Sequence, residues 1–414
     1  MNYDETIEYI HSTPKFARVL GNTLLRRLLS KMDNPQKKLK FIHIAGTNGK
    51  GSCAVMLAEI LKLCGLRTGL FTSPYIIRFN ERIRVNGEQI PDARLAETAS
   101  EIKNIIDKNN VPVSEFALDT AIAFKYFADE KCDIVILETG LGGRLDATNV
   151  ITSPVVSVIM SVGFDHMQYL GNTISAITTE KCGIIKNNRP VVVYPDLPYE
   201  ALSVIKRFCK SRNAELIQAD MPLKSHNGLI YKGKNYELSL GGEFQIYNAA
   251  VVIETADRLN SLGFSVPESA VRKGLTLAKN PARFERLDCG LIIDGAHNKP
   301  AAAALCKSLK ALGKPVYLCI AMMGDKDIAS CAEELSKLNP IVTVTEIPMP
   351  RCAKAETLAN EFLKHNVKVR IEKNCLTAAK DVLKTSQGSG IAVVCGSLYF
   401  AAEIRKVFKN ETEI

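Results

Sequence analysis

Short hydrophobic runs separated by polar turns recur along the chain. The first run, at 41–45, precedes a glycine-rich turn, and apolar residues then fall at i, i+3, i+4 and i+7 from Leu57 to Cys64. This pattern predicts a buried strand, a loop and an amphipathic helix. Further runs rich in β-branched residues lie at 134–137, 155–160 and 191–193. Because these runs show no polar alternation, they predict strands of a parallel sheet covered on both faces.

A second series of alternating strands and helices begins near residue 285. We expect strands at 291–294, 315–321, 341–346, 367–371 and 391–395, and helices at 300–312, 327–338, 355–364 and 375–385, followed by a final helix. Such regular alternation favours a doubly wound sheet. The polar stretch 279–283, which contains a proline, is interpreted as a linker. The sequence therefore predicts two α/β domains, 1–284 and 285–414, with a ligand between them.

The composition agrees with this domain organisation and indicates the cellular compartment of the protein. A chain of 414 residues suits two or three domains, and 46% apolar with 23% charged residues is typical of a folded globular protein. The N-terminus has no basic and apolar leader, and no stretch approaches 18 uninterrupted apolar residues. The twelve cysteines are scattered without a C-x-x-C pair, which favours reduced, buried thiols. We expect a cytoplasmic protein.

The net charge of +9 would suit either nucleic acid or a small polyanionic substrate. The chain has no tryptophan and only 7% aromatic residues, so it lacks the basic and aromatic interleaving of many nucleic-acid-binding surfaces. A basic P-loop protein that binds nucleic acid is therefore the weaker alternative.

A glycine-rich loop joins the first strand to its helix. Backbone N–H groups and the helix dipole favour phosphate at such a position. Lys50 would reach the β and γ phosphates, and Ser52 could face a magnesium ion. The loop departs from G-x-x-x-x-G-K-[ST], because Ile44 stands at the first glycine and Gly51 separates Lys50 from Ser52. A plain glycine turn is the alternative. The candidate nucleotide-binding residues are Gly46, Thr47, Asn48, Gly49, Lys50, Gly51 and Ser52.

Two more predicted strands end in polar groups. Glu138 follows the buried run at 134–137, where an acid is well placed to hold magnesium opposite a phosphate loop. A dinucleotide fingerprint in the glycine-rich stretch after it is disfavoured, because the third glycine is missing and no evident helix follows. Asp165 and His166 follow the next strand. A lone histidine is more often structural than a ligand.

Several strings in this order resemble one family. Residues 43–52 look like the variant phosphate loop of the Mur ligase superfamily, in its folylpolyglutamate synthase and dihydrofolate synthase branch. Residues 138–149 resemble that branch's E-x-G-L-G-G-R-L-D-A-T-N motif, and 165–171 resemble D-H-x-x-x-L-G. Residues 180–184 resemble E-K-A-G-I, with Cys182 for alanine. The resemblance extends from about residue 35 to the C-terminus.

The resemblance implies a fold, a metal site and a set of catalytic residues. It implies an N-terminal P-loop ATPase domain with a parallel-rich sheet and a C-terminal Rossmann-like glutamate ligase domain. Ser73, in a segment similar to S-P-H-L…E-R-I…N-G with Tyr75 for histidine, would join Glu138, His166 and a carbamylated Lys181 as magnesium ligands. The catalytic residues would be Lys50, Glu138, His166 and Lys181.

It also implies contacts with nucleotide and folate. Asn248 would contact adenine, Arg283 matches the arginine of G-R-x-E, and the D-G-A-H-N motif would place Asp294 at the ribose and His297 near the phosphates. The implied substrate-binding residues are Arg82, Phe116, Ala117, Leu145, Asp146 and Ala147. Ala117 replaces the glutamate of the family's F-E-x-x-T-A pattern, which bears on substrate preference more than on reaction type.

The implied activity is that of an ATP-dependent acid–amino-acid ligase. It would use ATP and Mg²⁺ to add L-glutamate to the carboxylate of folate, and also of dihydropteroate, through an acyl phosphate that domain closure shields from water. The expected enzyme is a monomer without nucleic-acid or membrane partners. A Mur-type ligase of peptidoglycan precursors is the alternative, disfavoured by Ser73-Pro74 and by Gly142-Gly143-Arg144.

Overall fold

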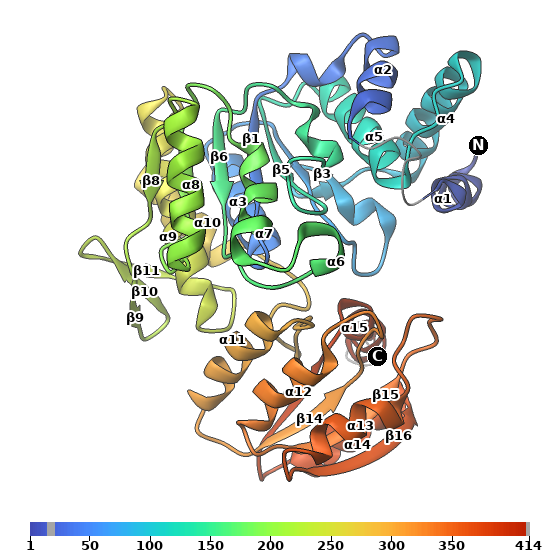
Figure 1. The fold of residues 1–414 in the computed structure, drawn as a ribbon, viewed down its shortest axis with the longest axis vertical. Helices are drawn as coiled ribbons and strands as arrows, with labels where there is room; N and C mark the ends of the chain where they lie inside the picture. The colour runs from blue at the N-terminus through green and yellow to red at the C-terminus, as the bar shows by residue number, and fades with distance from the viewer. Residues whose placement is uncertain (15–20, 411–414) are drawn as a thin grey trace. The chain divides into compact units, whose positions relative to one another are not determined.

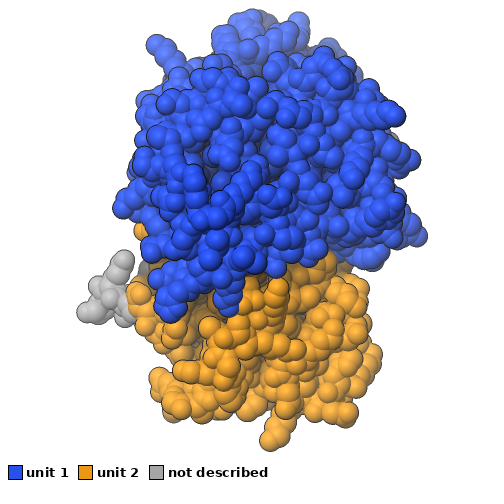
Figure 2. Space-filling model, turned by 90° about the vertical axis from the view of Figure 1, so that its left-hand side faces the viewer, with its two compact units in different colours: residues 1–238, 246–278 blue, residues 239–245, 279–414 orange. Residues whose placement is uncertain are grey.

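A computed structural model describes residues 1–14 and 21–410. The chain forms two compact units, coloured separately in Figure 2. Unit 1 comprises Met1–Leu238 and Ile246–Ala278, and unit 2 comprises Ser239–Gln245 and Lys279–Ile414. The predicted boundary between independently folding domains, at residues 284 and 285, stays a prediction.

Unit 1 is built on an eight-stranded sheet with the strand order β4-β3-β2-β5-β1-β6-β7-β8 (Figure 1). The strands are β1 (Phe41–Ala45), β2 (Thr68–Phe71), β3 (Ile83–Val85), β4 (Glu88–Gln89), β5 (Ile134–Glu138), β6 (Val156–Ile159), β7 (Val191–Val193) and β8 (Leu216–Gln218). All neighbours are parallel except the β2–β3 and β3–β4 pairs. Four predicted strands, at β1, β5, β6 and β7, are confirmed.

The register of the central strands aligns their carboxyl ends. In β1, Ile44 pairs with Glu138 of β5 on one side and with Val158 of β6 on the other. Every residue of these three strands is buried. Burial on both faces explains why the strands are mostly apolar; the exceptions are His43, Glu138 and Ser157. Parallel strands deliver the loops after their carboxyl ends to one edge of a sheet, so the segments following β1, β5 and β6 meet there.

Helices cover both faces of this sheet. In chain order the helices built mainly from unit 1, not all of which touch the sheet, are α1 (Tyr3–Ser12), α2 (Thr23–Lys31), η1 (Pro35–Lys38), α3 (Lys50–Leu63), η2 (Phe79–Arg82), α4 (Asp92–Asn109), α5 (Glu115–Asp129), η3 (Ala147–Val150), α6 (Met167–Leu170), α7 (Ile174–Lys181), η4 (Cys182–Ile184), α8 (Tyr199–Ser211), α9 (Phe244–Ser261) and α10 (Glu268–Leu277). The predicted hairpin turn at Asn86-Gly87 is confirmed, since both residues have positive φ and join β3 to β4.

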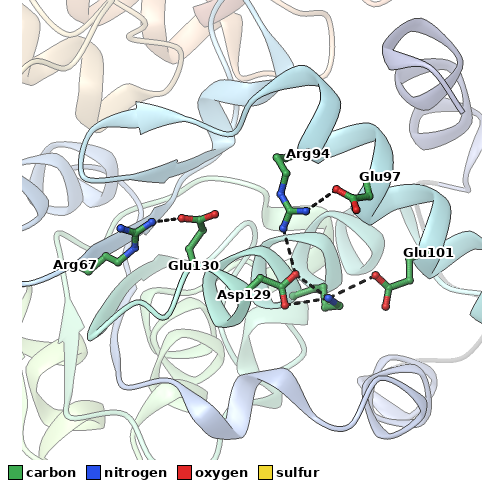
Figure 3. A network of polar contacts seen from close by, with 7 residues as sticks. Arg67, Arg94, Glu97, Glu101, Asp129 and Glu130 are labelled. Atoms are coloured by element: carbon green, nitrogen blue, oxygen red, sulfur yellow. Dashed lines mark hydrogen bonds and ion pairs between the residues drawn. The ribbon is translucent and has the colours of Figure 1, made fainter.

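Ion pairs join α4 to α5, and a separate pair links Arg67, just before β2, to Glu130 at the end of α5 (Figure 3). Arg94 of α4 lies 3.6 Å from Asp129 of α5, and Lys125 bridges Asp129 at 2.7 Å and Glu101 of α4 at 3.5 Å. All of these side chains are at least partly exposed. Such pairs contribute little stability individually, so the network orients the two helices more than it stabilises them.

The segment between β8 and α9 forms a small three-stranded sheet that the sequence patterns did not predict. It consists of β9 (Leu223–Ser225), β10 (Gly228–Tyr231) and β11 (Lys234–Glu237), all antiparallel. Tyr231 of β10 is buried, and its hydroxyl donates a 2.6 Å hydrogen bond to Glu254 of α9. This contact fixes the small sheet against the helices of unit 1.

Unit 2 has a six-stranded sheet with the order β12-β13-β17-β14-β15-β16. The strands are β12 (Glu285–Arg286), β13 (Ile292–Ile293), β14 (Val316–Ile320), β15 (Ile341–Glu346), β16 (Lys368–Asn374) and β17 (Ile391–Cys395). The helices are α11 (Lys299–Lys310), α12 (Ile328–Ser336), α13 (Ala355–Leu363), α14 (Cys375–Ser386) and α15 (Leu398–Asn410). The predicted alternation and the doubly wound sheet are confirmed, and only β12 is antiparallel to its neighbour.

All twelve cysteines lie within the described residues, and none forms a disulfide. Most are buried, and Cys289, between β12 and β13, is the exposed one. The predicted free thiols are therefore confirmed.

Gly274→Ala is expected to destabilise the protein, although alanine favours helices over glycine by about 1 kcal/mol. A Cβ at this position of α10 would lie 2.4 Å from Ile60 Cγ1 and 2.9 Å from the Ile60 Cα of α3. The two helices would have to separate, at a cost of about 1–3 kcal/mol. Urea unfolding checks this, with Lys273→Ala on the exposed face of α10 as the control. A stabilised Gly274→Ala variant would contradict the packing.

Candidate active site

The phosphate loop is folded tightly between β1 and α3. Gly49 has φ +86°, and an added Cβ there would lie 2.5 Å from Asn248 Oδ1. A Cβ on Gly46 would lie 2.6 Å from Met160 Cβ, so both glycines are required by close approach. Lys50, the first residue of α3, donates from Nζ to the carbonyl groups of Gly46 at 3.1 Å and Thr47 at 3.3 Å.

The segment after β6 lies directly beside this loop. The amide of Thr47 donates to the Ser161 carbonyl at 2.7 Å, and the Thr47 hydroxyl donates to the Gly163 carbonyl at 3.0 Å. In return, the Gly163 amide donates to the Thr47 hydroxyl at 3.1 Å. This segment leads to Asp165 and His166, and the His166 side chain is 39% exposed. The structure therefore brings the candidate histidine segment to the same edge as the phosphate loop.

Glu138 lies at the end of β5, 4% exposed, and its Oε2 accepts a 3.2 Å hydrogen bond from the Ser73 amide. Two of the predicted metal ligands are thus in contact. Within residues 1–14 and 21–410, no group of three or more histidine, cysteine, aspartate or glutamate residues could hold a metal ion. Mg²⁺ is usually held by one or two carboxylates together with substrate phosphates. One buried carboxylate beside a phosphate loop fits that donor set.

Lys181, at the end of α7, is buried at 2% exposure. Burial lowers the pKa of its ammonium group to about 7, with a further lowering by the positive charge of Lys50 and an opposing effect of Asp165. A Cβ on Gly143 would lie 2.9 Å from the Lys181 carbonyl oxygen. The end of α7 that carries Lys181 therefore packs against the loop that follows β5.

The glycine-rich loop after β5 packs closely against α7 and η4 and is hydrogen-bonded to α7. A Cβ on Gly143 would lie 2.8 Å from the Glu180 carbonyl oxygen, and one on Gly183 would lie 2.2 Å from the Arg144 Cα. The Arg144 amide donates to the Glu180 carbonyl at 2.7 Å, and the Arg144 guanidinium donates to the Glu180 carboxylate at 2.9 Å. The loop and the helix that carries Lys181 therefore hold each other in place.

The candidate substrate residues lie in and around this same loop. Phe116 of α5 covers Gly140, since an added Cβ there would lie 2.6 Å from the ring. Ala117 and Ala147 are buried in one apolar cluster, whereas Leu145 is 44% exposed. The loop thus presents an exposed apolar side chain from a rigid base.

Arg82 is paired with Asp119, a residue that sequence reasoning missed. Arg82 Nε lies 3.7 Å from the carboxylate of Asp119, which is 1% exposed. Arg82 also lies over the rings of Tyr75, at 5.2 Å, and Phe79, at 5.7 Å. Burial raises the pKa of Asp119 to about 7, against the lowering effect of Arg82, and Glu115 raises it further. The acid lies within the predominantly apolar α5, which gave no signal of a charge pair.

Sequence reasoning also missed a buried series of hydrogen bonds that joins β1 to the glycine-rich loop after β5. His43, in the middle of β1 and 0% exposed, places Nε2 2.8 Å from the Thr148 hydroxyl. The Thr148 hydroxyl donates to Asp146 Oδ1 at 2.5 Å. Burial and the nearby Lys186 lower the pKa of His43 to about 3. A signal was available, because a histidine inside an apolar strand must find a hydrogen-bond partner.

Asn248 of α9 is 2% exposed and packs against Gly49 of the phosphate loop. It therefore lies beside the predicted nucleotide site. Its contact with adenine stays a prediction.

In unit 2, Arg283 is flanked by two residues in the left-handed region, Ala282 at φ +58° and Phe284 at φ +50°. Such backbone costs of order 1 kcal/mol per residue and must be held by its surroundings. The Ala282 amide donates to Glu285 Oε2 at 2.9 Å, and the Phe284 amide donates to Asp294 Oδ2 at 2.7 Å. This network fixes the backbone on both sides of the arginine.

The two other candidate nucleotide residues of unit 2 follow β13. Asp294 Oδ1 accepts a 2.7 Å hydrogen bond from the Ala296 amide, and burial raises the pKa of Asp294 while Arg283 lowers it. His297 Nδ1 lies 2.8 Å from the Gly295 carbonyl and donates to it. Both side chains therefore help to shape the turn, and their predicted contacts with ribose and phosphate stay predictions.

Comparison with known proteins identifies the family. A family model of the Mur ligase middle domain matches residues 44–256, and a model of the dihydrofolate synthetase C-terminal domain matches 280–407. Folylpolyglutamate synthase from Lacticaseibacillus casei is 35% identical over 428 aligned residues, which cover 98% of each chain. The chain belongs to the folylpolyglutamate synthase and dihydrofolate synthase family.

Further members of the folylpolyglutamate synthase and dihydrofolate synthase family agree with this assignment. Dihydrofolate synthase/folylpolyglutamate synthase from Bacillus subtilis is 35% identical over 434 residues, covering 98% of this chain and 99% of that protein. The structure of Escherichia coli FolC in complex with DHPP and ADP superposes with a TM-score of 0.89 at 27% identity, covering 100% of this chain and 99% of that one. The predicted family and fold class are confirmed. In the described residues, no helix is long and apolar enough to cross a membrane.

His43 is expected to make stability fall as the pH drops. The pKa of His43 is about 3 in the folded protein and 6.5 when unperturbed. Its contribution to the free energy of unfolding is therefore complete above pH 6.5 and is lost as the pH falls toward 3. In this pH window the unfolded chain binds a proton at His43 and the folded chain does not. The free energy of unfolding therefore falls by about 1.4 kcal/mol for each pH unit.

Urea unfolding of the wild type and His43→Gln, at several pH values from neutral to acid, measures this slope. The variant should lose less stability on acidification than the wild type. His226→Gln, at an exposed position of unit 1, is the control. Parallel slopes for the wild type and His43→Gln would refute the buried neutral imidazole.

Proposed function

We propose that this protein is an ATP-dependent ligase that joins L-glutamate to the carboxylate of folate, and also to that of dihydropteroate. The observation that carries this proposal is the meeting of the phosphate loop, Glu138 and the loop containing Asp146 at one edge of the sheet in unit 1. The names of two relatives support it: the Lacticaseibacillus casei protein is a folylpolyglutamate synthase, and the Bacillus subtilis protein is named for both activities.

The reaction needs ATP because a carboxylate is a poor electrophile near neutral pH. A carboxylate oxygen of the folate attacks the γ-phosphorus of ATP, and ADP leaves. The product is an acyl phosphate, whose carbonyl carbon is then attacked by the amine of glutamate. Phosphate leaves with its electron pair, and loss of a proton from nitrogen gives the amide. The overall products are the elongated folate, ADP and phosphate.

The chain's own residues would act mainly by position and charge. Lys50 and the loop amides would stabilise the negative charge that develops on the transferred phosphoryl group. Magnesium, when bound, supplies further positive charge at the phosphate oxygens. Ser73, Glu138, His166 and Lys181 are the proposed ligands, with Lys181 as its carbamate. The carbamate matters because it turns a cation into an anionic oxygen ligand.

The folate side would be formed by the loop after β5 and by α5. Phe116 and Ala147 line the rigid base of this region, and Leu145 is exposed for contact. Ala117 is buried near the start of α5 and brings no charge to the substrate surface. We propose that this position influences which folate form is preferred.

We propose that the protein acts in the cytoplasm as a monomer, without nucleic-acid or membrane partners. All twelve cysteines are free, which suits a reducing compartment. In unit 2, Arg283, Asp294 and His297 are proposed to contact the nucleotide.

Phosphate release with MgATP and L-glutamate tests the function, with dihydropteroate and tetrahydrofolate compared as acceptors. We expect turnover with both, and a loss of at least about 100-fold in kcat for Lys50→Met, because a charge that stabilises the transition state is removed. Lys62→Met, at the exposed end of the same helix, is the matched control. Activity with tetrahydrofolate alone would remove the dihydrofolate synthase part of the proposal. Activity only with a nucleotide-linked sugar acid would favour the Mur-type alternative.

A further inference from the structure

We propose that His43 and Thr148 are positioning residues that fix the Asp146 carboxylate, and with it the substrate loop, for the folate acceptor. This inference rests on the proposed function. None of the sequence motifs assigns a role to His43 or Thr148. The structure places them in one continuous hydrogen-bonded chain that runs from the strand of the phosphate loop to the substrate loop.

The chain is short, buried and complete up to the carboxylate. His43 Nε2 lies 2.8 Å from the Thr148 hydroxyl, which lies 2.5 Å from Asp146 Oδ1. His43 and Thr148 are both 0% exposed, and Asp146 is 6% exposed. A buried polar chain of this kind specifies one arrangement of the groups it joins, because any other arrangement leaves polar atoms without partners.

The donors around Asp146 set the direction of the hydrogen bonds. Oδ1 also accepts from the Thr148 amide at 3.0 Å, and Oδ2 accepts from the Leu141 amide at 2.7 Å. Burial raises the pKa of the Asp146 carboxyl, and these donors oppose that effect. The Thr148 hydroxyl uses its single proton to donate to Asp146 Oδ1. The oxygen of Thr148 must then accept from His43, so His43 carries its proton on Nε2. This tautomer is assigned from the network.

The remaining nitrogen of His43 shows that the residue is not there for packing alone. His43 Nδ1 is buried without a hydrogen-bond partner among the described residues. An unsatisfied buried polar atom costs about 1–3 kcal/mol, which an apolar side chain at this position would avoid. The Nε2–H donor is the feature of the histidine that an apolar side chain would lack.

The position of the chain connects two parts of the site. His43 lies in β1, three residues before Gly46, where the phosphate loop begins. Asp146 is the cap of η3, and its neighbours Leu145 and Ala147 are candidate substrate residues. The hydrogen bonds therefore hold the folate loop at a fixed place relative to the phosphate loop. A carboxylate must meet the γ-phosphate in line, and small misplacements of this kind reduce turnover strongly.

Paired substitutions separate the hydrogen bonds from packing. Thr148→Val and His43→Leu keep the approximate volume but remove the hydroxyl and the N–H donor, whereas Thr148→Ser and His43→Gln keep them. For the first pair we expect KM for tetrahydrofolate or dihydropteroate to rise about 10-fold or more, with KM for ATP nearly unchanged. The second pair should stay within about 3-fold of the wild type.

The control is Thr255→Val, in which an equally buried threonine hydroxyl donates to the Val251 carbonyl within its own helix. It should lower stability without changing the ratio of the two KM values. Equal KM changes for folate and ATP, or a Thr148→Ser variant as impaired as Thr148→Val, would overturn the proposal.

A spectroscopic readout keeps this inference separate from the proposed function. If the wild type turns over neither folate acceptor, the proposed function is wrong. ¹⁵N NMR of histidine-labelled protein then tests the hydrogen bonds of His43 independently of activity. We expect a neutral imidazole protonated at Nε2 for His43, with its signal changed in Thr148→Val and retained in Thr148→Ser. An imidazole protonated at Nδ1 would overturn the proposal.

Discussion

The parallel register of β5, β1 and β6 is the constraint on which the rest of unit 1 depends. The three strands are fully buried, and their backbone pairing together with close packing fixes their relative positions. Polar residues that follow the carboxyl ends of these strands therefore lie at the same edge of the sheet. The phosphate loop, Glu138 and the histidine segment are thereby brought together from three separate stretches of the chain, at residues 46–52, 138 and 165–166. Gly46 then allows the phosphate loop to approach Met160 after β6, and Gly143 and Gly183 allow the loop after β5 to approach α7 and η4.

Burial at this edge also sets the electrostatic character of the site. Lys181 and Asp119 are both taken out of water, and each has a pKa of about 7 in consequence. A buried charge is costly unless a partner compensates for it. Asp119 has such a partner in Arg82, whereas Lys181 lies near the positive charge of Lys50. Burial therefore favours the uncharged amine of Lys181.

The sequence predicted the elements whose pattern is local and periodic. The buried strands, the α3 helix, the Asn86-Gly87 turn and nearly all of unit 2 follow from apolar spacing and turn residues. The β9–β11 sheet was missed because its short strands have mostly exposed, polar faces. The phosphate loop, Glu138 and the Asp165–His166 segment were found because each follows a buried strand. Lys181 and Asn248 lie in helices and were predicted only through the resemblance to the family. The contacts of His43 with Thr148 and of Arg82 with Asp119 could not be found, since they join segments through the folded core.

The turn between β12 and β13 carries the exposed thiol of Cys289, whereas most other cysteines are buried. Thiol-directed reagents act on accessible groups, so the native protein offers a single preferred attachment point in unit 2. A fluorophore or spin label can be placed there without any substitution. Because this turn lies only a few residues beyond Arg283, such a label would report motion in the segment that presents this arginine.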